Sequence, residues 1–246
     1  MNLLNIENLS VSVGEKKILD KVNFTVNKGE VHIILGPNGS GKSSLLMSIL
    51  GNDRYNVDGG NIYFENERIN DLKTDERARK GIFLCFQQVQ EIEGLIYKDY
   101  LRELKSKVKN EKIDLMFNMG LAKKFKDVGL NESHVTRSLN SGFSGGEKKK
   151  SELLQMKFLN PKLILLDEID SGLDIDAIRS VCLTLKEMLT EDTGVIIITH
   201  REEVIRELNV THVHCLINGK NVKTGDIELF NQINKEGYSN ILKGDN

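Results

Sequence analysis

The hydrophobic and polar positions of this chain follow two patterns, and each pattern predicts a different kind of strand. Apolar side chains alternate with polar ones over residues 4–13, which is typical of a strand with one buried face. Residues 18–26 give a second candidate strand. Residues 31–35 form a short apolar run instead, as expected of a strand that is buried on both faces.

Segments with helical periodicity separate the later apolar runs. After the third strand, a Gly-rich loop leads into a helix whose apolar face begins at Leu45 and that ends at Gly51. Two further apolar runs, residues 163–166 and 195–199, flank a candidate helix over residues 175–189. Because strands here alternate with helices, the pattern favours a parallel sheet.

Two regions depart from this alternation. Residues 88–157 have helical periodicity, many charges and few strand signals, so we interpret them as a helical insertion. Residues 213–217, the turn at Asn218-Gly219 and the following Val222 are typical of a β-hairpin.

The composition excludes several classes of protein. With 34 Lys and Arg against 36 Asp and Glu, the formal net charge of −2 argues against a broadly basic nucleic-acid binder. Trp is absent and aromatic residues make up 6%, which disfavours a base-stacking platform. No apolar run approaches the roughly 18–20 residues of a membrane span. The cysteines Cys85, Cys182 and Cys215 are far apart, so we expect a reducing compartment and no iron–sulfur cluster on this chain.

The Gly-rich loop fits the phosphate-binding pattern GxxxxGK[ST] and lies between a buried strand and a helix, as that motif requires. Its glycines let backbone N–H groups turn toward phosphate oxygens, and the helix N-terminus adds partial positive charge. Lys42 supplies a charge for the β- and γ-phosphates, and the Ser43 hydroxyl is the expected Mg²⁺ ligand. The predicted ATP-binding residues are Gly36, Pro37, Asn38, Gly39, Ser40, Gly41, Lys42, Ser43 and Ser44.

The apolar run 163–166 ends in two carboxylates, Asp167 and Glu168. This arrangement brings both acids out at the C-terminal edge of a buried strand, where ligands of α/β sheets bind. Asp167 can hold Mg²⁺, and Glu168 can polarise the water that attacks the γ-phosphate.

Further motifs carry a resemblance to a known family. Residues 143–147, Phe-Ser-Gly-Gly-Glu, resemble the LSGGQ signature of ATP-binding-cassette (ABC) ATPases. Gln87 follows an apolar run as the Q-loop glutamine does, residues 171–174 resemble the D-loop, and His200 stands where the switch histidine does. The resemblance implies a P-loop NTPase fold of the ABC type, an α/β mixed sheet with an antiparallel β subdomain and a helical subdomain.

The resemblance also implies a transient head-to-tail homodimer with ATP and Mg²⁺ at its interface. The loop of one copy and Ser144, Gly145, Gly146 and Glu147 of the other would grip each ATP. By the same resemblance His200 contacts the γ-phosphate, Asp174 crosses the interface, and Gln87 links Mg²⁺ to movement of the helical subdomain. The implied catalytic set is Glu168, His200, Gln87 and Lys42, and the implied metal set is Ser43, Gln87 and Asp167.

We therefore expect residues 1–246 to form a single ABC ATPase domain. Residues 1–87 and 158–246 form its catalytic α/β core with the β subdomain, and residues 88–157 form the helical subdomain that carries the signature. We expect Lys148, Lys149 and Lys150 to form a solvated helix face rather than a nucleic-acid patch.

Finer details resemble the SufC family, the ATPases of the SUF iron–sulfur cluster assembly system. Transporter ATPases usually have Gln, Pro and Ala where this chain has Glu147, Ile169 and Gly172. The family commonly has Tyr-Pro after the Q-loop glutamine, whereas Gln88-Val89 stands here. The resemblance implies SufB and SufD as partners, no nucleic acid, no membrane insertion, and a soluble protein of a bacterial cytoplasm or plastid stroma. The abundant Asn and Lys would suit an apicoplast-type plastid.

Two alternatives stay open at this stage. An ATP-binding subunit of a membrane ABC transporter shares the chemistry and differs in its partner. A nucleotide-gated interaction module without catalysis is disfavoured because Lys42, Asp167, Glu168 and His200 are all present.

Overall fold

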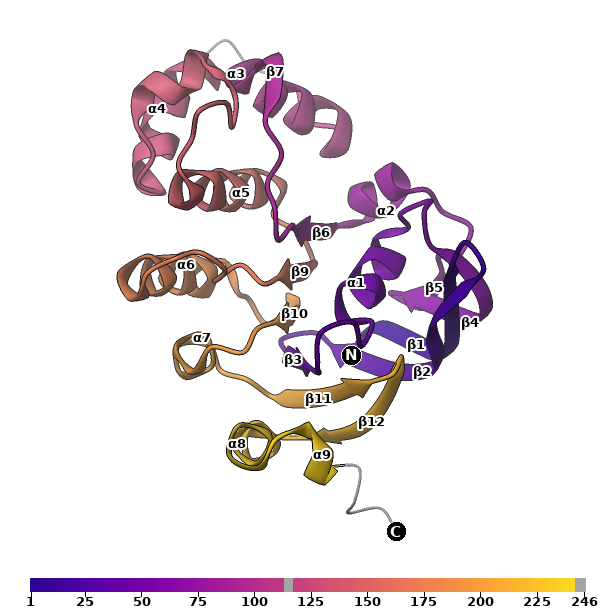
Figure 1. The fold of residues 1–246 in the computed structure, drawn as a ribbon. Helices are drawn as coiled ribbons and strands as arrows, with labels where there is room; N and C mark the ends of the chain where they lie inside the picture. Colours follow the sequence, from indigo (N-terminus) through magenta and orange to yellow (C-terminus); the bar gives the residue numbers. More distant parts are fainter. Residues whose placement is uncertain (113–116, 242–246) are drawn as a thin grey trace.

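The computed structural model describes residues 1–112 and 117–241, which build two sheets and a separate helical lobe (Figure 1). The central sheet has the strand order β12 (Lys220–Gly225), β11 (His212–Ile217), β3 (Val31–Leu35), β10 (Gly194–Ile198), β9 (Leu163–Asp167) and β6 (Ile82–Cys85). From β11 to β6 every neighbouring pair is parallel, and β12 returns antiparallel to β11. The predicted mixed α/β sheet and C-terminal hairpin are therefore confirmed.

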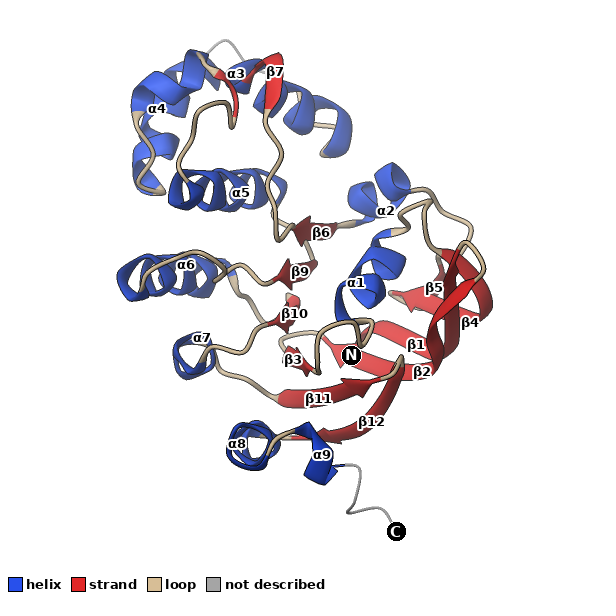
Figure 2. Cartoon of the chain, in the orientation of Figure 1, coloured by secondary structure: helices blue, strands red, loops and turns tan. Residues whose placement is uncertain are grey.

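The second sheet is antiparallel and packs over one face of the first (Figure 2). Its strand order is β2 (Lys16–Asn27), β1 (Asn2–Val13), β4 (Asn56–Phe64) and β5 (Glu67–Arg68). Helix α1 (Lys42–Leu50) lies between the two sheets, because its buried leucines join side chains from both in one hydrophobic cluster. This packing fixes the start of α1 against the carboxyl end of β3, where the phosphate-binding motif stands.

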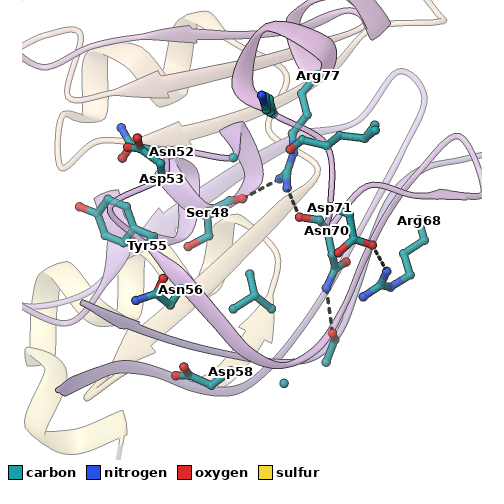
Figure 3. A pocket seen from close by; sticks show the side chains of 16 residues that line it. Ser48, Asn52, Asp53, Tyr55, Asn56, Asp58, Arg68, Asn70, Asp71 and Arg77 are labelled. Atoms are coloured by element: carbon teal, nitrogen blue, oxygen red, sulfur yellow. Dashed lines mark hydrogen bonds and ion pairs between the residues drawn. The ribbon is translucent and has the colours of Figure 1, made fainter. Parts of the chain in front are cut away.

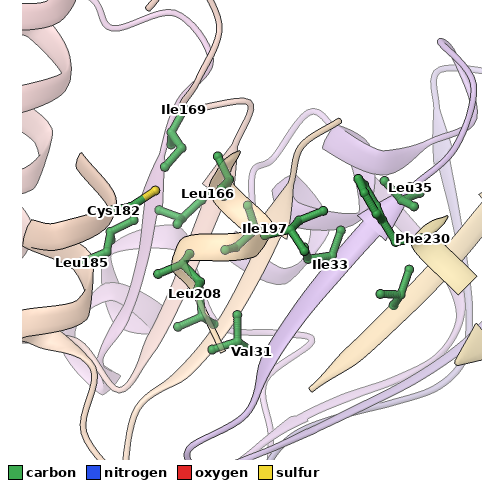
Figure 4. Packing of buried hydrophobic residues seen from close by; sticks show 14 of the residues in the cluster. Val31, Ile33, Leu35, Leu166, Ile169, Cys182, Leu185, Ile197, Leu208 and Phe230 are labelled. Atoms are coloured by element: carbon green, nitrogen blue, oxygen red, sulfur yellow. The ribbon is translucent and has the colours of Figure 1, made fainter. Parts of the chain in front are cut away.

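Helices cover the opposite face of the central sheet. These are α6 (Ile175–Met188), α7 (Glu202–Glu207), α8 (Ile227–Glu236) and the short α9 (Tyr238–Ile241). Figure 4 shows Ile33, Leu166 and Ile197 of the strands packed against Cys182 and Leu185 of α6. Cys85, Cys182 and Cys215 are free thiols buried in this core.

The helical lobe lies beyond the β6 edge of the central sheet (Figure 1). It contains β7 (Ile92–Ile96), α3 (Tyr97–Glu103), the π-turn η1 (Leu104–Val108), α4 (Phe117–Asp127), the 3-10 turn η2 (Glu132–Thr136), β8 (Ser138–Leu139) and α5 (Gly145–Leu159). A hydrophobic cluster of its own, which includes Tyr97, Phe125 and Phe143, holds it together. The lobe also has a β7–β8 strand pair, and α5 runs past Lys157, where we expected the lobe to end.

No helix within residues 1–112 and 117–241 combines the length and the apolar character that crossing a membrane requires.

A buried arginine closes the end of α1. Helix α2 (Thr74–Lys80) places Arg77 beside an open polar cavity of about 610 Å³ (Figure 3). Its guanidinium donates to the carbonyl oxygens of Ser48 and Ile49 in the last turn of α1, and to those of Leu72 and Asn70. Burial lowers the pKa of Arg77 to about 10, which leaves it charged at neutral pH. Arg77 thus caps the helix that carries the phosphate-binding loop.

We expect Arg77→Met to lower the free energy of unfolding by about 3 kcal/mol or more, because several buried carbonyls lose their donor. Arg68→Met is the matched control on the same cavity. Arg68 is 46% exposed and pairs with Asp71, so its loss should cost less than about 1 kcal/mol. Urea unfolding of both variants measures the difference, and equal costs would contradict the capping role.

Candidate functional site

The predicted phosphate-binding loop connects β3 to α1 at the carboxyl edge of the central sheet. A Cβ on Gly36 would overlap the carbonyl oxygen of Leu216, so only glycine fits where the loop leaves β3. Ser40 Oγ is buried, and no residue of 1–112 or 117–241 gives it a hydrogen-bond partner. A hydroxyl in this position fits a loop that takes a phosphate oxygen as its partner.

The side chain of Lys42 lies across this loop. Its Nζ donates to the carbonyl oxygens of Gly36 at 2.7 Å and Pro37 at 3.2 Å. Burial lowers the pKa of Lys42, while Glu168 and Asp167 oppose that shift. The lysine charge is therefore held at the loop that we predict to bind phosphate.

Two of the three residues predicted to hold Mg²⁺, Ser43 and Asp167, lie in contact. Ser43 Oγ at the start of α1 donates to Asp167 Oδ1 at the end of β9, at 3.0 Å. Burial raises the pKa of Asp167, and the hydrogen bond from Ser43 opposes it. A hydroxyl and a carboxylate are ligands that Mg²⁺ prefers, so these residues fit the predicted ion.

The second acid lies beside the Q-loop glutamine. Gln87 Nε2 donates to Glu168 Oε2 at 2.6 Å. The two residues follow β6 and β9, which are neighbours in the sheet, so the parallel register brings them together. Glu168 adopts φ 47, and this turn carries its side chain away from the line of β9.

These side chains surround a cavity of about 460 Å³. Its lining residues are Lys16, Ile18, Asn38, Gly39, Gly41, Lys42, Ser43, Ser44, Gln87 and Glu168. Lys16 and Ile18 were not among the predicted site residues, because both belong to the other sheet and no local motif marks them.

Tyr238 is a third residue near the site that the sequence did not single out. Its hydroxyl accepts a hydrogen bond from the backbone N–H of Gly36 at 3.1 Å, and it lies 3.4 Å from His200 Nδ1. Burial lowers the pKa of His200, so its imidazole is neutral at pH 7. Tyr238 of α9 therefore connects the predicted switch histidine to the first residue of the phosphate-binding loop.

The remaining predicted residues cap helices outside this cavity. Ser144 caps α5 in a capping box, since its Oγ accepts from the Glu147 N–H while Glu147 Oε2 accepts from the Ser144 N–H. Gly145 and Gly146 form the first turn of α5. Asp174 caps α6 by accepting from the Ala177 N–H at 2.7 Å. Among the described residues, the cavity wall includes none of these side chains.

The expectation of a solvated face over residues 148–150 is wrong for Lys149. Lys149 is buried and pairs with Glu152 at 3.3 Å, with both side chains less than a tenth exposed. Lys149 Nζ also donates to the carbonyl oxygens of Phe86 and Gln87, and Glu152 Oε1 accepts from the Phe86 N–H at 2.8 Å. The pair therefore clamps the backbone of the Q-loop to α5, a contact that a charge pattern alone does not reveal.

Comparisons with known proteins identify the family of this chain. The sequence profile of a family described as ABC transporter matches residues 19–171. A probable ABC transporter ATP-binding protein of Streptococcus pyogenes serotype M3 is 44% identical over 99% of this chain and 96% of its own length. A probable ATP-dependent transporter, ycf16, of Pyropia yezoensis is 43% identical over 98% of each chain.

Solved structures give the same picture. A nucleotide-free ATP-binding cassette from an ABC transporter has a TM-score of 0.77 at 28% identity, over the whole of both chains. The ADP conformation of an ATP-binding cassette of an ABC transporter has a TM-score of 0.75 at 29% identity, again over the whole of both chains.

Proposed function

The chain belongs to the ABC transporter family of ATPases, which hydrolyse ATP with Mg²⁺, and from this premise we propose that it drives conformational change in a SufB/SufD scaffold during iron–sulfur cluster assembly. The proposal has three parts, which are the catalytic roles of the residues in the cavity, the pairing of two copies around ATP, and the identity of the partner.

The catalytic roles follow from the geometry of the cavity. Lys42 and the loop N–H groups hold the phosphates. Ser43 and Asp167 would hold Mg²⁺, which would offset the charge of the phosphate oxygens. Gln87 holds Glu168 Oε2, which leaves Oε1 to accept the proton of the attacking water. The water oxygen bonds to the γ-phosphorus, the bond to the β–γ bridging oxygen breaks, and ADP and phosphate leave.

The pairing of two copies follows from the position of the signature. Ser144, Gly145 and Gly146 are the N-terminal residues of α5, but the wall of the cavity, as far as the described residues form it, does not include them. A helix N-terminus binds phosphate well, so a second copy must bring its signature to the open side of the cavity. ATP then holds the two copies together, and hydrolysis releases them.

One observation carries the choice of partner. The residues that differ from transporter ATPases take part in the fold, since Ile169 is buried in the main core and Gly172 adopts φ 74. That conformation strains any residue with a Cβ, so an Ala at 172 is disfavoured. The structure thus accommodates the residues in which this chain resembles SufC and differs from transporter ATPases, and that resemblance supports a SufB/SufD partner.

The surface beside the Q-loop is the proposed scaffold contact. Phe86 is 41% exposed and Ile92 is 45% exposed, and both line a cavity of about 210 Å³ between the core and the helical lobe. Exposed apolar side chains at one site mark an interaction surface. Because Phe86 directly precedes Gln87, a scaffold bound to this surface would lie next to the Q-loop and could sense the nucleotide site.

A pull-down tests the partner directly. The tagged wild-type chain should retain SufB and SufD, and Phe86→Ser should retain less of both at unchanged ATP binding. Met119→Ser is the matched control, because Met119 is 72% exposed on α4, outside that cavity. The proposal would be overturned if the wild type and the Met119→Ser control both failed to retain SufB and SufD.

The second candidate is an ATP-binding subunit of a membrane transporter. The relatives from Streptococcus pyogenes and Pyropia yezoensis favour it, because both are described as transporter proteins. In that case the same pull-down retains a permease with several membrane spans in place of SufB and SufD.

A further inference from the structure

Three of the five histidines of this chain gather where the two sheets meet. His32 of β3 and His212 of β11 are register partners on adjacent parallel strands, and His214 follows two residues later on the same face. Phe24 of β2 packs against His32 and His214 from the other sheet. The group lies at the amino end of β3, whereas the phosphate-binding loop follows its carboxyl end, so ATP hydrolysis does not account for it.

A directed chain of hydrogen bonds runs through these imidazoles. Glu30 Oε2 accepts from His32 Nε2, and His32 Nδ1 lies 2.9 Å from His214 Nε2. His214 Nδ1 lies 2.9 Å from Thr224 Oγ1, which accepts from Asn221. Because a carboxylate can only accept, His32 carries its proton on Nε2 and His214 donates from Nε2 to His32 Nδ1. The Thr224 hydroxyl then donates to His214 Nδ1, so the ring N–H groups of His32 and His214 and this hydroxyl all have acceptors.

At the Glu30 end of this series of hydrogen bonds, three side chains carry groups that can bind a metal ion. One ligand atom each from Glu30, His32 and His212 lies within 4.8 Å of the other two. His32 Nε2 and Glu30 Oε2 are 2.9 Å apart. Two ligands on one ion at 2.0–2.2 Å are about 3.0–3.5 Å apart. Glu30 and His32 are therefore close to the required spacing, and the His212 ligand atom, within 4.8 Å of both, needs to move toward them to complete the set. Glu30 is 21% exposed and His212 is half-buried, which gives an ion a path from solvent.

We propose that Glu30, His32 and His212 form a binding site for a divalent first-row transition-metal ion such as Zn²⁺. Two imidazoles and one carboxylate suit Zn²⁺, Co²⁺ and Fe²⁺ better than Mg²⁺, which prefers oxygen ligands alone. Water completes the coordination on the exposed side. The site is separate from the Mg²⁺ site at Ser43 and Asp167.

The surrounding residues form an outer shell of the kind that metal sites use. The Asn27 N–H and Asn27 Nδ2 donate to the Glu30 carboxylate at 2.7 and 3.0 Å, which fixes its direction. A metal on His32 Nε2 replaces the proton there, and the neutral ring then carries its proton on Nδ1. His32 therefore donates to His214 Nε2, and the hydrogen-bond chain reverses its direction without a buried charge.

The metal would join two segments that are far apart in sequence, residues 30–32 and the start of β11 at His212. Glu30 lies in the turn before β3, His32 in β3, and His212 at the start of β11. An ion that binds only the folded chain stabilises it by mass action, so Zn²⁺ should raise the melting temperature of the wild type, and the rise should continue with the logarithm of the free Zn²⁺ concentration above the Kd.

Isothermal titration of the nucleotide-free chain, without a polyhistidine tag, tests the site with ZnCl₂. The wild type should bind one Zn²⁺ with high affinity, and Glu30→Gln and His212→Gln should each weaken that binding about tenfold or more. His200→Gln, which removes a histidine elsewhere, should keep the wild-type affinity. CoCl₂ and anaerobic FeCl₂ are used in the same titration to establish the order of preference.

Circular dichroism checks that each variant is folded, and Glu30→Gln alone carries the comparison if His212→Gln does not fold. Two results overturn the proposal. One is a wild type that binds no Zn²⁺ stoichiometrically, and the other is folded variants with undiminished affinity.

Discussion

Glu168→Gln should lower the turnover number for ATP about a thousandfold while ATP binding remains near the wild-type level, because a general base contributes about 10²–10⁴ to the rate. The amide keeps the size of the side chain, and its oxygen still accepts from Gln87 Nε2. What it loses is the ability to take the proton of the attacking water. Phosphate release under saturating Mg·ATP and equilibrium binding of ATP measure the two quantities.

Glu191→Gln is the control for this substitution, because Glu191 is exposed and outside the cavity wall. It should leave turnover unchanged. A Glu168→Gln chain that hydrolyses ATP at the wild-type rate would refute the role of Glu168 as base. A chain that no longer binds ATP would instead place Glu168 in substrate binding.

Lys149→Met should lower the free energy of unfolding by about 3–5 kcal/mol, because removal of one partner leaves a buried charge uncompensated. It also takes donors from the carbonyl oxygens of Phe86 and Gln87, so the Q-loop should lose its fixed position and turnover should fall with it. Chemical unfolding and phosphate release measure the two effects. Lys148→Met is the matched control, because Lys148 pairs with Glu91 at the surface and should cost less than about 1 kcal/mol.

The pH dependence of stability tests the burial of Glu152, which forms the ion pair with Lys149. Burial raises the pKa of Glu152 from 4.5 to about 6, with Lys149 opposing the shift. The folded chain therefore binds the Glu152 proton more tightly than the unfolded chain, and the stability that this supplies is lost as pH rises through about 6. The unfolding free energy of the wild type, minus that of Glu152→Gln, should fall between pH 4.5 and 6. A difference that rises there contradicts the burial of Glu152.

The sequence predicted the parts of the molecule that local patterns encode. The apolar run 31–35 and the periodic helix that ends at Gly51 have the predicted type and nearly the predicted bounds, since each depends on neighbouring residues alone. The contact of Ser43 with Asp167 was also predictable, because both stand next to strands whose carboxyl ends share one edge of a parallel sheet.

The residues that the sequence did not reveal owe their positions to long-range packing. Tyr238 reaches Gly36 from 202 residues away, and Lys16 reaches the cavity from the second sheet. Lys149 reads as one of three solvated lysines until the fold places Glu152 and the Q-loop around it. The pairing of His32 with His212 likewise exists only once β3 and β11 are register partners.

The central claim is that ATP lies between two copies of this chain, and a complementation assay tests it most directly. Lys42→Ala removes the charge of the loop, and Ser144→Arg blocks the signature, so neither variant should hydrolyse ATP alone. When the two variants are combined in equal amounts at high concentration, about half of the dimers contain one copy of each. Each such dimer has one intact site out of two, so turnover should return to about a quarter of the wild-type value. A mixture as inactive as its two components would contradict the account.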